Sequence, residues 1–228
     1  MRHAIYYVPD PSSALHELGS SWLGRDVFSN AVLPQPDDRL TGFTMDACRY
    51  GFHGTLKPPF RMKENVSIDV FEAALRNLAN QHESFSVGPI ELRMIDGFLA
   101  LVPVDENVEL SHLAADCVQQ LDNFRTPPGE AEVRKRRAVG LTVTQDALLQ
   151  RWGYPYVLEE FRFHMTLTSC LSPEDAVWIH PLAQSYFKTV IGRPLQIDAI
   201  THMVEPDNGE ALLVRQRMPL VSNALKAA

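Results

Sequence analysis

The sequence predicts an α+β fold of two pseudo-symmetric lobes, each with an antiparallel sheet and helices, whose cassette strands face a central cleft. Two segments, 49–57 and 161–170, alternate apolar and polar side chains with the period of two of half-buried strands. Both contain His-x-Thr-Leu, here called the cassette: HGTL at 53–56 and HMTL at 164–167. Each cassette is followed by a predicted helix and then a hairpin. The chain therefore carries an internal repeat of roughly 110 residues.

The first repeat begins with a strand in the opening RHAIYYVP. The segment 49–57 predicts the next strand, which Pro58 and Pro59 end because proline cannot donate a hydrogen bond to a sheet. Residues 66–82 predict a helix. The runs 84–95 and 97–104 predict two strands joined at Asp96-Gly97, a strong hairpin signal.

The second repeat follows a predicted helix at 140–153, with Thr144 as its N-cap and Gly153 as its stop. After the second cassette, a helix is predicted over 173–188, with Ser172 as N-cap and Pro173 in its first turn. Two strands, 194–205 and 210–218, are joined through Asp207-Asn208-Gly209. We expect one bilobal domain over 1–228, with a first lobe of roughly 1–105 and a second of roughly 106–220.

Composition narrows the class of protein. The chain has 228 residues, 45% of them hydrophobic, which is enough for a sizeable core. A net charge of -7 argues against broad binding to nucleic acid or to an anionic membrane. The three widely spaced cysteines indicate a reducing compartment rather than a disulfide framework. Pro9 and Asp10 interrupt the opening before a signal-like apolar run develops, and no stretch approaches ~20 apolar residues. We therefore expect a soluble cytoplasmic protein with no membrane partner.

The polar face of each cassette pairs an imidazole with a hydroxyl: His53 with Thr55, and His164 with Thr166. Imidazole has an ordinary pKa of about 6.5, so near neutral pH one histidine acts as a base while the other acts as an acid. This combination favours in-line displacement at a phosphodiester, with His53 and His164 catalytic and with no metal or cofactor. The residues leave open which histidine is the base.

Further polar residues near the cassettes are candidates for substrate binding. Hydroxyls and cations bind phosphoryl oxygens, and aromatic rings stack on a base or a ribose. Alternation also directs only one of Tyr6 and Tyr7 toward the cleft. The predicted phosphate- and substrate-binding residues are Thr55, Thr166, Arg49, Arg162, Lys57, Tyr154 and Tyr156. The basic run 134–137 is either a solvated helix face or the source of one or two cleft-lining cations.

Three other readings compete with a small-molecule enzyme. A zinc site would use Cys48 with His53, or Cys170 with His164, but these spacings are not those of a close-paired ligand motif. A binding or sensor module would hold a cyclic phosphate or nucleotide without turnover. An enzyme acting on an RNA terminus would use the same chemistry, but the acidic chain lacks a long basic stripe.

The doubled cassettes resemble those of the two-histidine (2H) phosphoesterase superfamily, over nearly the whole chain. This resemblance implies a bilobal α+β fold, metal-independent opening or closing of ribose cyclic phosphates, and functional roles for the two histidines and two threonines. The chain looks still more like the DUF1045 branch, which is associated with phosphonate metabolism. The segments that carry this likeness are RHAIYYVP, WLGRD, YGFHGTLKPPF and RRAVGLTVTQDALLQRWGYPYVLEEFRFHMTLT. It implies a phosphodiesterase near carbon–phosphorus bond breakdown, where ribose 1,2-cyclic phosphates arise. The exact substrate, the direction of the reaction and the oligomeric state stay open.

Overall fold

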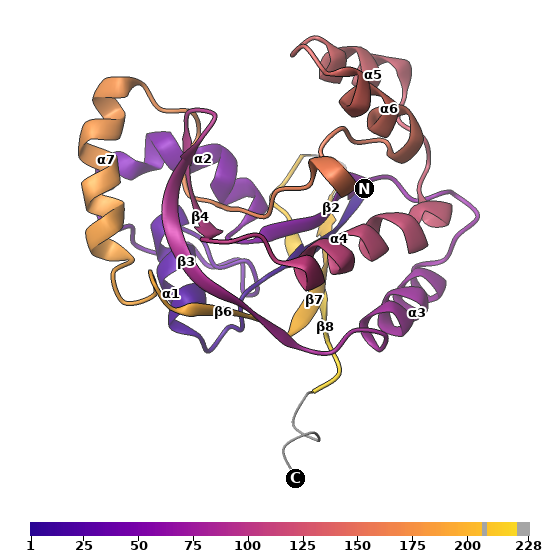
Figure 1. Cartoon of the computed structure of the whole chain (residues 1–228), viewed down its shortest axis with the longest axis horizontal. Helices are drawn as coiled ribbons and strands as arrows, with labels where there is room; N and C mark the ends of the chain where they lie inside the picture. The colour runs from indigo at the N-terminus through magenta and orange to yellow at the C-terminus, as the bar shows by residue number, and fades with distance from the viewer. Residues whose placement is uncertain (207–208, 223–228) are drawn as a thin grey trace.

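The computed structural model describes residues 1–206 and 209–222, and confirms the α+β class. Across these residues, eight strands form one sheet in the order β6-β3-β4-β5-β2-β1-β7-β8, with every neighbouring pair antiparallel (Figure 1). The strands are β1 (Arg2–Tyr7), β2 (Gly54–Phe60), β3 (Phe85–Ile95), β4 (Phe98–Pro103), β5 (Met165–Thr166), β6 (Pro194–Ile197), β7 (Ala199–Glu205) and β8 (Leu213–Pro219). The α-helices are α1 (Ala14–Leu23), α2 (Thr41–Tyr50), α3 (Ile68–Ala79), α4 (Val108–Gln120), α5 (Glu130–Arg137), α6 (Val143–Trp152) and α7 (Pro173–Tyr186).

The two cassette strands, β2 and β5, are hydrogen-bonded neighbours at the centre of the sheet. They meet side by side, where the sequence suggested two strands facing each other from separate sheets. One half of the sheet is β2-β1-β7-β8 and the other is β5-β4-β3-β6. Each half therefore takes strands from both sides of the expected boundary near residue 105.

Local signals place several helix and turn boundaries correctly. Ser172 caps α7 by accepting a hydrogen bond from the backbone of Asp175, and Gly153 ends α6 in the left-handed conformation at φ 78°. The hairpin between β3 and β4 turns at Asp96 and Gly97, both with positive φ. The predicted N-cap of α6 is wrong, because Thr142 rather than Thr144 forms the capping box with Gln145.

Four strand predictions need correction. The strand that Pro58 and Pro59 were expected to end continues to Phe60, which pairs with His3 of β1. Residues 49–50 belong to α2, and the strand begins only at Gly54. Only 165–166 of the segment 161–170 are assigned to a strand, although Phe163, Met165 and Leu167 are buried as the alternation predicts. The run 194–205 divides at Asp198 into β6, which pairs with β3, and β7, which pairs with β1. The predicted turn at 207–209 falls largely on residues 207–208, which lie outside the described residues.

The two faces of the sheet support separate hydrophobic clusters. The larger cluster includes Ile5 and Tyr7 of β1, and the smaller includes Ala4 and Tyr6 of the same strand. This alternation is the period of two expected of a strand buried on both faces. The helix α4 packs against β2, and α3 packs against β7 and β8 (Figure 1).

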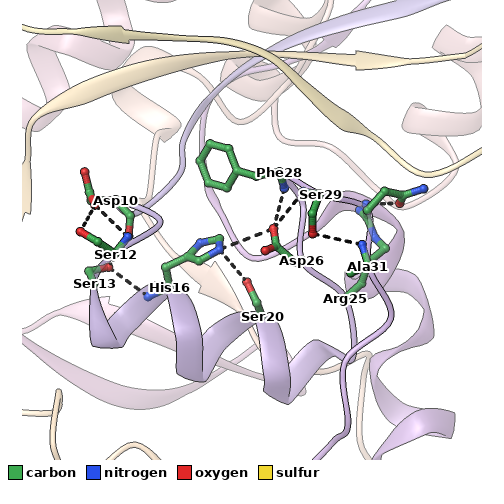
Figure 2. A network of polar contacts seen from close by, with 11 residues as sticks. Asp10, Ser12, Ser13, His16, Ser20, Arg25, Asp26, Phe28, Ser29 and Ala31 are labelled. Carbon is green, nitrogen blue, oxygen red and sulfur yellow. Dashed lines mark hydrogen bonds and ion pairs between the residues drawn. The ribbon is translucent and has the colours of Figure 1, made fainter.

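A polar network ties α1 to the loop that follows it (Figure 2). His16 Nε2 lies 3.3 Å from the hydroxyl of Ser20 and 3.6 Å from Asp26 Oδ1. Asp26 accepts hydrogen bonds from the backbone N–H groups of Phe28 and Ser29. The network holds the loop that carries Arg25, whose role at the site is described below.

Among the residues that the structure describes, no helix combines the length and the apolar character needed to cross a bilayer.

Candidate active site

The ladder between β2 and β5 brings the two cassettes together. Gly54 pairs with Met165, so the same antiparallel register sets His53 opposite Thr166 and Thr55 opposite His164. Residues directly opposite each other have Cβ atoms about 4.5–5.5 Å apart and lie on the same face. The four polar side chains therefore form a two-by-two cluster, with an imidazole and a hydroxyl from each strand.

Tight packing fixes the short segment that carries His53. Gly51 ends α2 at φ 78°, and a Cβ atom there would lie 2.7 Å from Val27. Phe52 is fully buried against Gly19 of α1, where a Cβ atom would lie 2.1 Å from its ring. Two glycines thus permit the close approach of α1 and of the Val27 loop, which anchors the residues just before His53.

Arg25 stabilises the same segment through hydrogen bonds. Its side chain donates to the carbonyl oxygens of Cys48 at 2.9 Å and Arg49 at 3.1 Å, at the C-terminal end of α2. It also donates to the carbonyl of Leu212 at 3.1 Å and to Asn30 at 3.1 Å. The carbonyls of Cys48 and Arg49 also accept from the backbone N–H groups of Gly51 and Leu212, and the buried guanidinium adds a second donor to each.

The imidazole of His53 is oriented by three contacts. Its Nδ1 donates to the carbonyl of Gly51 at 2.8 Å, because a carbonyl oxygen can only accept. Its Nε2 lies 3.2 Å from the Thr55 hydroxyl. The ring stacks on Tyr6, with centroids 3.8 Å apart and planes 18° apart. In the neutral form, Nε2 therefore carries the lone pair and is directed along the cassette.

The second cassette is held by the core and by the neighbouring strand β4. Met165 is fully buried, and the backbone N–H of Leu167 donates to the carbonyl of Leu99 at 2.8 Å. The buried hydroxyl of Thr168 accepts from the N–H of Leu99 at 3.0 Å. Trp22 of α1 donates to the carbonyl of Leu167 at 3.0 Å. These bonds keep the polar face of the segment turned toward the first cassette.

His164 repeats the arrangement of His53. Its Nδ1 donates to the carbonyl of Arg162, two residues upstream, at 2.8 Å. In both cassettes Nδ1 donates to the carbonyl two residues upstream, so in the neutral form Nε2 of each ring carries the lone pair. The ring of Phe98 lies 5.5 Å from that of His164.

Burial lowers the pKa of both histidines. For His53 the pKa falls to about 4, because the charged form is poorly solvated and because a charge on His164 would repel it; the bond to Gly51 opposes this shift. The pKa of His164 is lowered by burial, against the opposing bond to Arg162.

Arg49 does not occupy the position predicted for it. It lies in α2 rather than on a strand, and its guanidinium forms an ion pair with the buried carboxylate of Glu205. Arg2 forms an ion pair with the same carboxylate. The parity argument failed because residues 49–50 are helical, so Arg49 shares no strand face with His53.

Lys57 also departs from the predicted face. Thr55 pairs with Tyr6, but Lys57 pairs with Ile5, so β2 takes two steps where β1 takes one. This bulge turns Lys57 to the opposite face. Its Nζ donates to the carbonyl of Val118 near the end of α4 at 3.0 Å, and burial lowers its pKa to about 8.

The remaining candidates for substrate binding, Arg162, Tyr154 and Tyr156, differ in their exposure to solvent. Arg162 is exposed, and its backbone carbonyl binds His164. Tyr154 is half-buried; its hydroxyl is near enough to that of Tyr6 for ionisation of one to raise the pKa of the other. Tyr156 is exposed, and its ring lies 5.7 Å from Tyr154. Tyr154 also packs against the buried cluster of Val118, Leu148 and Val157.

Of the basic run 134–137, Arg136 lies 4.6 Å above the ring of Tyr154 and forms an ion pair with Glu132 at 3.0 Å. Arg137 forms an ion pair with Asp146 of α6 at 2.6 Å.

Several residues with roles at the site were missed by sequence reasoning or only partly found. Alternation indicated that one of Tyr6 and Tyr7 faces the cleft, but not that Tyr6 stacks on His53. Gly54 has a clearer signal, because it is the glycine inside the first cassette where the second has methionine. A Cβ atom at Gly54 would lie 2.3 Å from the ring of Phe163. Arg25 gave no local signal, since its partners are distant in sequence.

Within the described part of the chain, no group of three or more His, Cys, Asp or Glu side chains is arranged to hold a metal ion. Cys48 lies in α2, and Cys170 is exposed in the loop after β5.

The fold and the site together define an α+β protein with paired His/Thr cassettes on adjacent central strands. A family model described as "Protein of unknown function (DUF1045)" matches residues 55–213. The chain belongs to this family, which confirms the resemblance seen in its sequence.

Two curated proteins named ribose 1,5-bisphosphate phosphokinase PhnN are similar to the chain. The protein from Janthinobacterium sp. (strain Marseille) is 38% identical, over 100% of this chain and 52% of its own length. That from Laribacter hongkongensis (strain HLHK9) is 35% identical, over 92% of this chain and 50% of its own length. The chain therefore spans about half the length of these relatives.

Solved structures with a similar arrangement include a phosphoesterase and E. coli LigT complexed with ATP. The phosphoesterase has a TM-score of 0.45 and 14% identity, and the match covers 96% of this chain and 98% of the other. LigT complexed with ATP has a TM-score of 0.43 and 13% identity, and the match covers 96% of this chain and 97% of the other.

Proposed function

We propose that the protein is a metal-independent cyclic phosphodiesterase that opens a small ribose or nucleotide cyclic phosphate, with His53 and His164 as general base and general acid. The observation that carries this proposal is the register of β2 and β5, which sets each histidine opposite the threonine of the other cassette. Two imidazoles with matching Nδ1 anchors direct their Nε2 atoms to proton transfer on one face of the sheet, and His53 Nε2 is within hydrogen-bond distance of the Thr55 hydroxyl.

The reaction needs one proton to be accepted and one to be donated. His53 Nε2 takes a proton from a water molecule as its oxygen forms a bond to phosphorus. The opposite P–O bond to the ribose breaks, and His164 Nε2–H protonates the leaving oxygen. The products are a phosphomonoester and a free ribose hydroxyl. Thr55 and Thr166 bind the non-bridging oxygens, where charge is stabilised in the transition state.

The electrostatics allow one base and one acid. Burial is the largest cause that lowers the pKa of each histidine, and repulsion between two charged rings acts on both of them. The pair therefore binds one proton more readily than two. An anionic cyclic phosphate between the rings raises both pKa values.

The curated relatives favour a ribose phosphate as the substrate. Their name describes action on ribose 1,5-bisphosphate, and the chain corresponds to about half of each of them. A ribose 1,2-cyclic phosphate is the cyclic ester that opens to a ribose 1-phosphate group. We place this substrate in phosphonate breakdown, with which the resemblance seen in the sequence associates the chain.

The test is turnover of a panel of cyclic phosphates in EDTA. The panel contains 2′,3′-cyclic nucleotides and ribose 1,2-cyclic phosphate, assayed with wild type, His53→Ala and His164→Ala. Because acid–base catalysis contributes ~10²–10⁴-fold per group, each variant should lose activity by at least about that much. His112→Ala is the matched control, since His112 is exposed on α4.

Activity that survives EDTA and collapses in both cassette variants supports the proposal. Stoichiometric zinc in the purified protein, with activity lost in EDTA, would contradict the proposal and indicate a zinc enzyme instead. Saturable binding of the panel without product by the folded wild type would replace it with a binding module.

A further inference from the structure

A groove at the start of β1 lies away from the cassettes. It has a volume of about 530 Å³, and residues of β1, β7 and β8 line it beside the first residue of α3. His3 of β1 is in its wall, on the face of the sheet that also carries Ile5 and Tyr7. The cassettes share the opposite face with Tyr6, which stacks on His53. The groove is therefore separate from the candidate active site.

A row of hydrogen-bonded side chains ends at this groove. Arg215 Nε donates to Glu72 Oε1 at 2.5 Å, and the same oxygen lies 3.2 Å from His202 Nδ1. His202 Nε2 in turn lies 3.0 Å from His3 Nδ1. His202 is fully buried, and His3 is 3% exposed. The row connects a carboxylate on α3 to an imidazole in the wall of the groove.

The carboxylate of Glu72 decides which nitrogen of each ring carries a proton. An ionised carboxylate can only accept, so Nδ1 of His202 carries the proton and Nε2 of that ring is an acceptor. Nδ1 of His3 must then donate, which places the lone pair of the neutral ring on its Nε2. Burial lowers the pKa of His3 to about 4, so the ring is neutral near pH 7. Within the described residues, Nε2 of His3 forms no hydrogen bond.

Two methionine sulfur atoms accompany this nitrogen in the groove. Met1 lies two residues before His3, so the alternation of an extended chain directs both side chains to one face. His3 pairs with Phe60 of β2, and the same antiparallel register, continued past the ends of both strands, sets Met62 opposite Met1. Side chains that lie directly opposite have Cβ atoms about 4.5–5.5 Å apart. Met1, His3 and Met62 all line the groove, which agrees with this placement.

One imidazole and two thioethers form a donor set that suits one class of metal ion. Neutral, soft sulfur ligands select Cu(I), and imidazole also binds copper. A histidine that donates its other N–H to a neighbour is held in one tautomer and orientation and is a more basic ligand. The rest of the wall is largely apolar, including Ile68, Val204 and Leu213, and Arg215 is already paired with Glu72. The groove therefore fits a soft monovalent cation better than a hydrated divalent one.

We propose that this groove is a Cu(I) site, in which Nε2 of His3 and the sulfur atoms of Met1 and Met62 bind the metal ion. His202 and Glu72 act as positioning residues, because their hydrogen bonds hold the ring of His3. Two of the three donors are thioethers, which distinguishes the set from groups of His, Cys, Asp and Glu. The site uses no residue of the cassettes, so it does not depend on the proposed function.

The test is an anaerobic titration with Cu(I), in competition with a chromogenic Cu(I) chelator. Thiols also bind Cu(I), so the exposed Cys170 and the half-buried Cys48 are replaced by serine in every protein. The resulting parent protein should bind one Cu(I) per chain, and X-ray absorption should show nitrogen and sulfur around the metal ion. Binding to the folded state should also raise the midpoint of thermal unfolding. Absence of stoichiometric binding overturns the site.

Variants of the parent protein identify the donors. Met62→Leu conserves side-chain volume, so it should fold, weaken binding and remove the shift in the midpoint; His3→Gln should also weaken binding. Each loss should be at least about tenfold, and His202→Gln should weaken binding by about 10–100-fold through the orientation of His3. Met45→Leu, exposed on α2, and His53→Ala, in the first cassette, should match the parent protein. Full binding by both Met62→Leu and His3→Gln, or loss of binding in His53→Ala, overturns the site.

Discussion

The ring of Tyr6 lies nearly parallel to the ring of His53, 3.8 Å away, on the face of the sheet that carries both cassettes. Tyr6 is itself almost completely buried. The tyrosine ring therefore shields one side of the imidazole from water. This contact links the hydrophobic packing of β1 to the proton affinity of His53.

Removing the aromatic ring of Tyr6 should change the pKa of His53. In Tyr6→Leu, water reaches the imidazole, so the pKa of His53 should rise from about 4 toward its ordinary 6.5. NMR titration of the ring protons measures this directly. Tyr6→Phe keeps the stack and should keep the low pKa; an equal shift in both variants would assign the effect to the hydroxyl instead.

The folded protein should lose stability as the pH falls from about 6.5 to 4. His3 and His202 are buried, with Nδ1 of His3 3.0 Å from Nε2 of His202, and burial lowers the pKa of each to about 4. Below pH 6.5 the unfolded chain binds protons that the folded chain does not, so the free energy of unfolding falls. Between pH 7.5 and pH 5.0 the loss should be roughly 2 kcal/mol for each histidine.

Urea unfolding at pH 7.5 and pH 5.0 measures this difference. His202→Gln should show a smaller pH dependence than wild type. His112→Gln, on the exposed face of α4, should show the wild-type dependence. Equal pH dependence in wild type and His202→Gln would exclude His202 as a source of the acid sensitivity.

Gly54→Ala should destabilise the protein because its new methyl group would meet the ring of Phe163 at 2.3 Å. Overpacking of this kind costs about 1–3 kcal/mol. Gly129→Ala is the control, since nothing lies within 4 Å of a Cβ atom at that position. The midpoints of urea unfolding compare them. A Gly54→Ala midpoint equal to wild type would mean that Phe163 moves aside without cost.

Arg25→Met should weaken both stability and activity. The change removes charge-assisted hydrogen bonds to Cys48 and Arg49 at the end of α2, and we expect a loss of roughly 3 kcal/mol. Gly51 and His53 follow the end of α2 directly, so turnover per folded molecule should also fall. This turnover is measured without denaturant, at a temperature well below the midpoint of thermal unfolding. Arg39→Met removes an exposed arginine and should change neither. Full turnover by Arg25→Met would show that His53 is positioned without it.

The parts of the site that the sequence predicts are those governed by local periodicity. His53, Thr55, His164 and Thr166 share faces within short segments, and the structure keeps those faces. Arg49 was misplaced because the period of two was extended into a helix, and Lys57 because a bulge reversed its face. The stack of Tyr6 on His53 and the contacts of Arg25 depend on residues distant along the chain. Only the tertiary fold reveals these contacts.

The exchange of strands between the two halves of the sheet bears on how the chain can be divided. A fragment of residues 1–105 would hold the hairpin β3-β4 and the pair β1-β2, but not β5, which joins β4 to β2. The remaining fragment would hold β7 and β8 without β1, against which β7 pairs. Neither fragment contains a complete half of the sheet. A cut near residue 105 would therefore leave unpaired strand edges in both fragments, β2 and β4 in the first and β7 in the second.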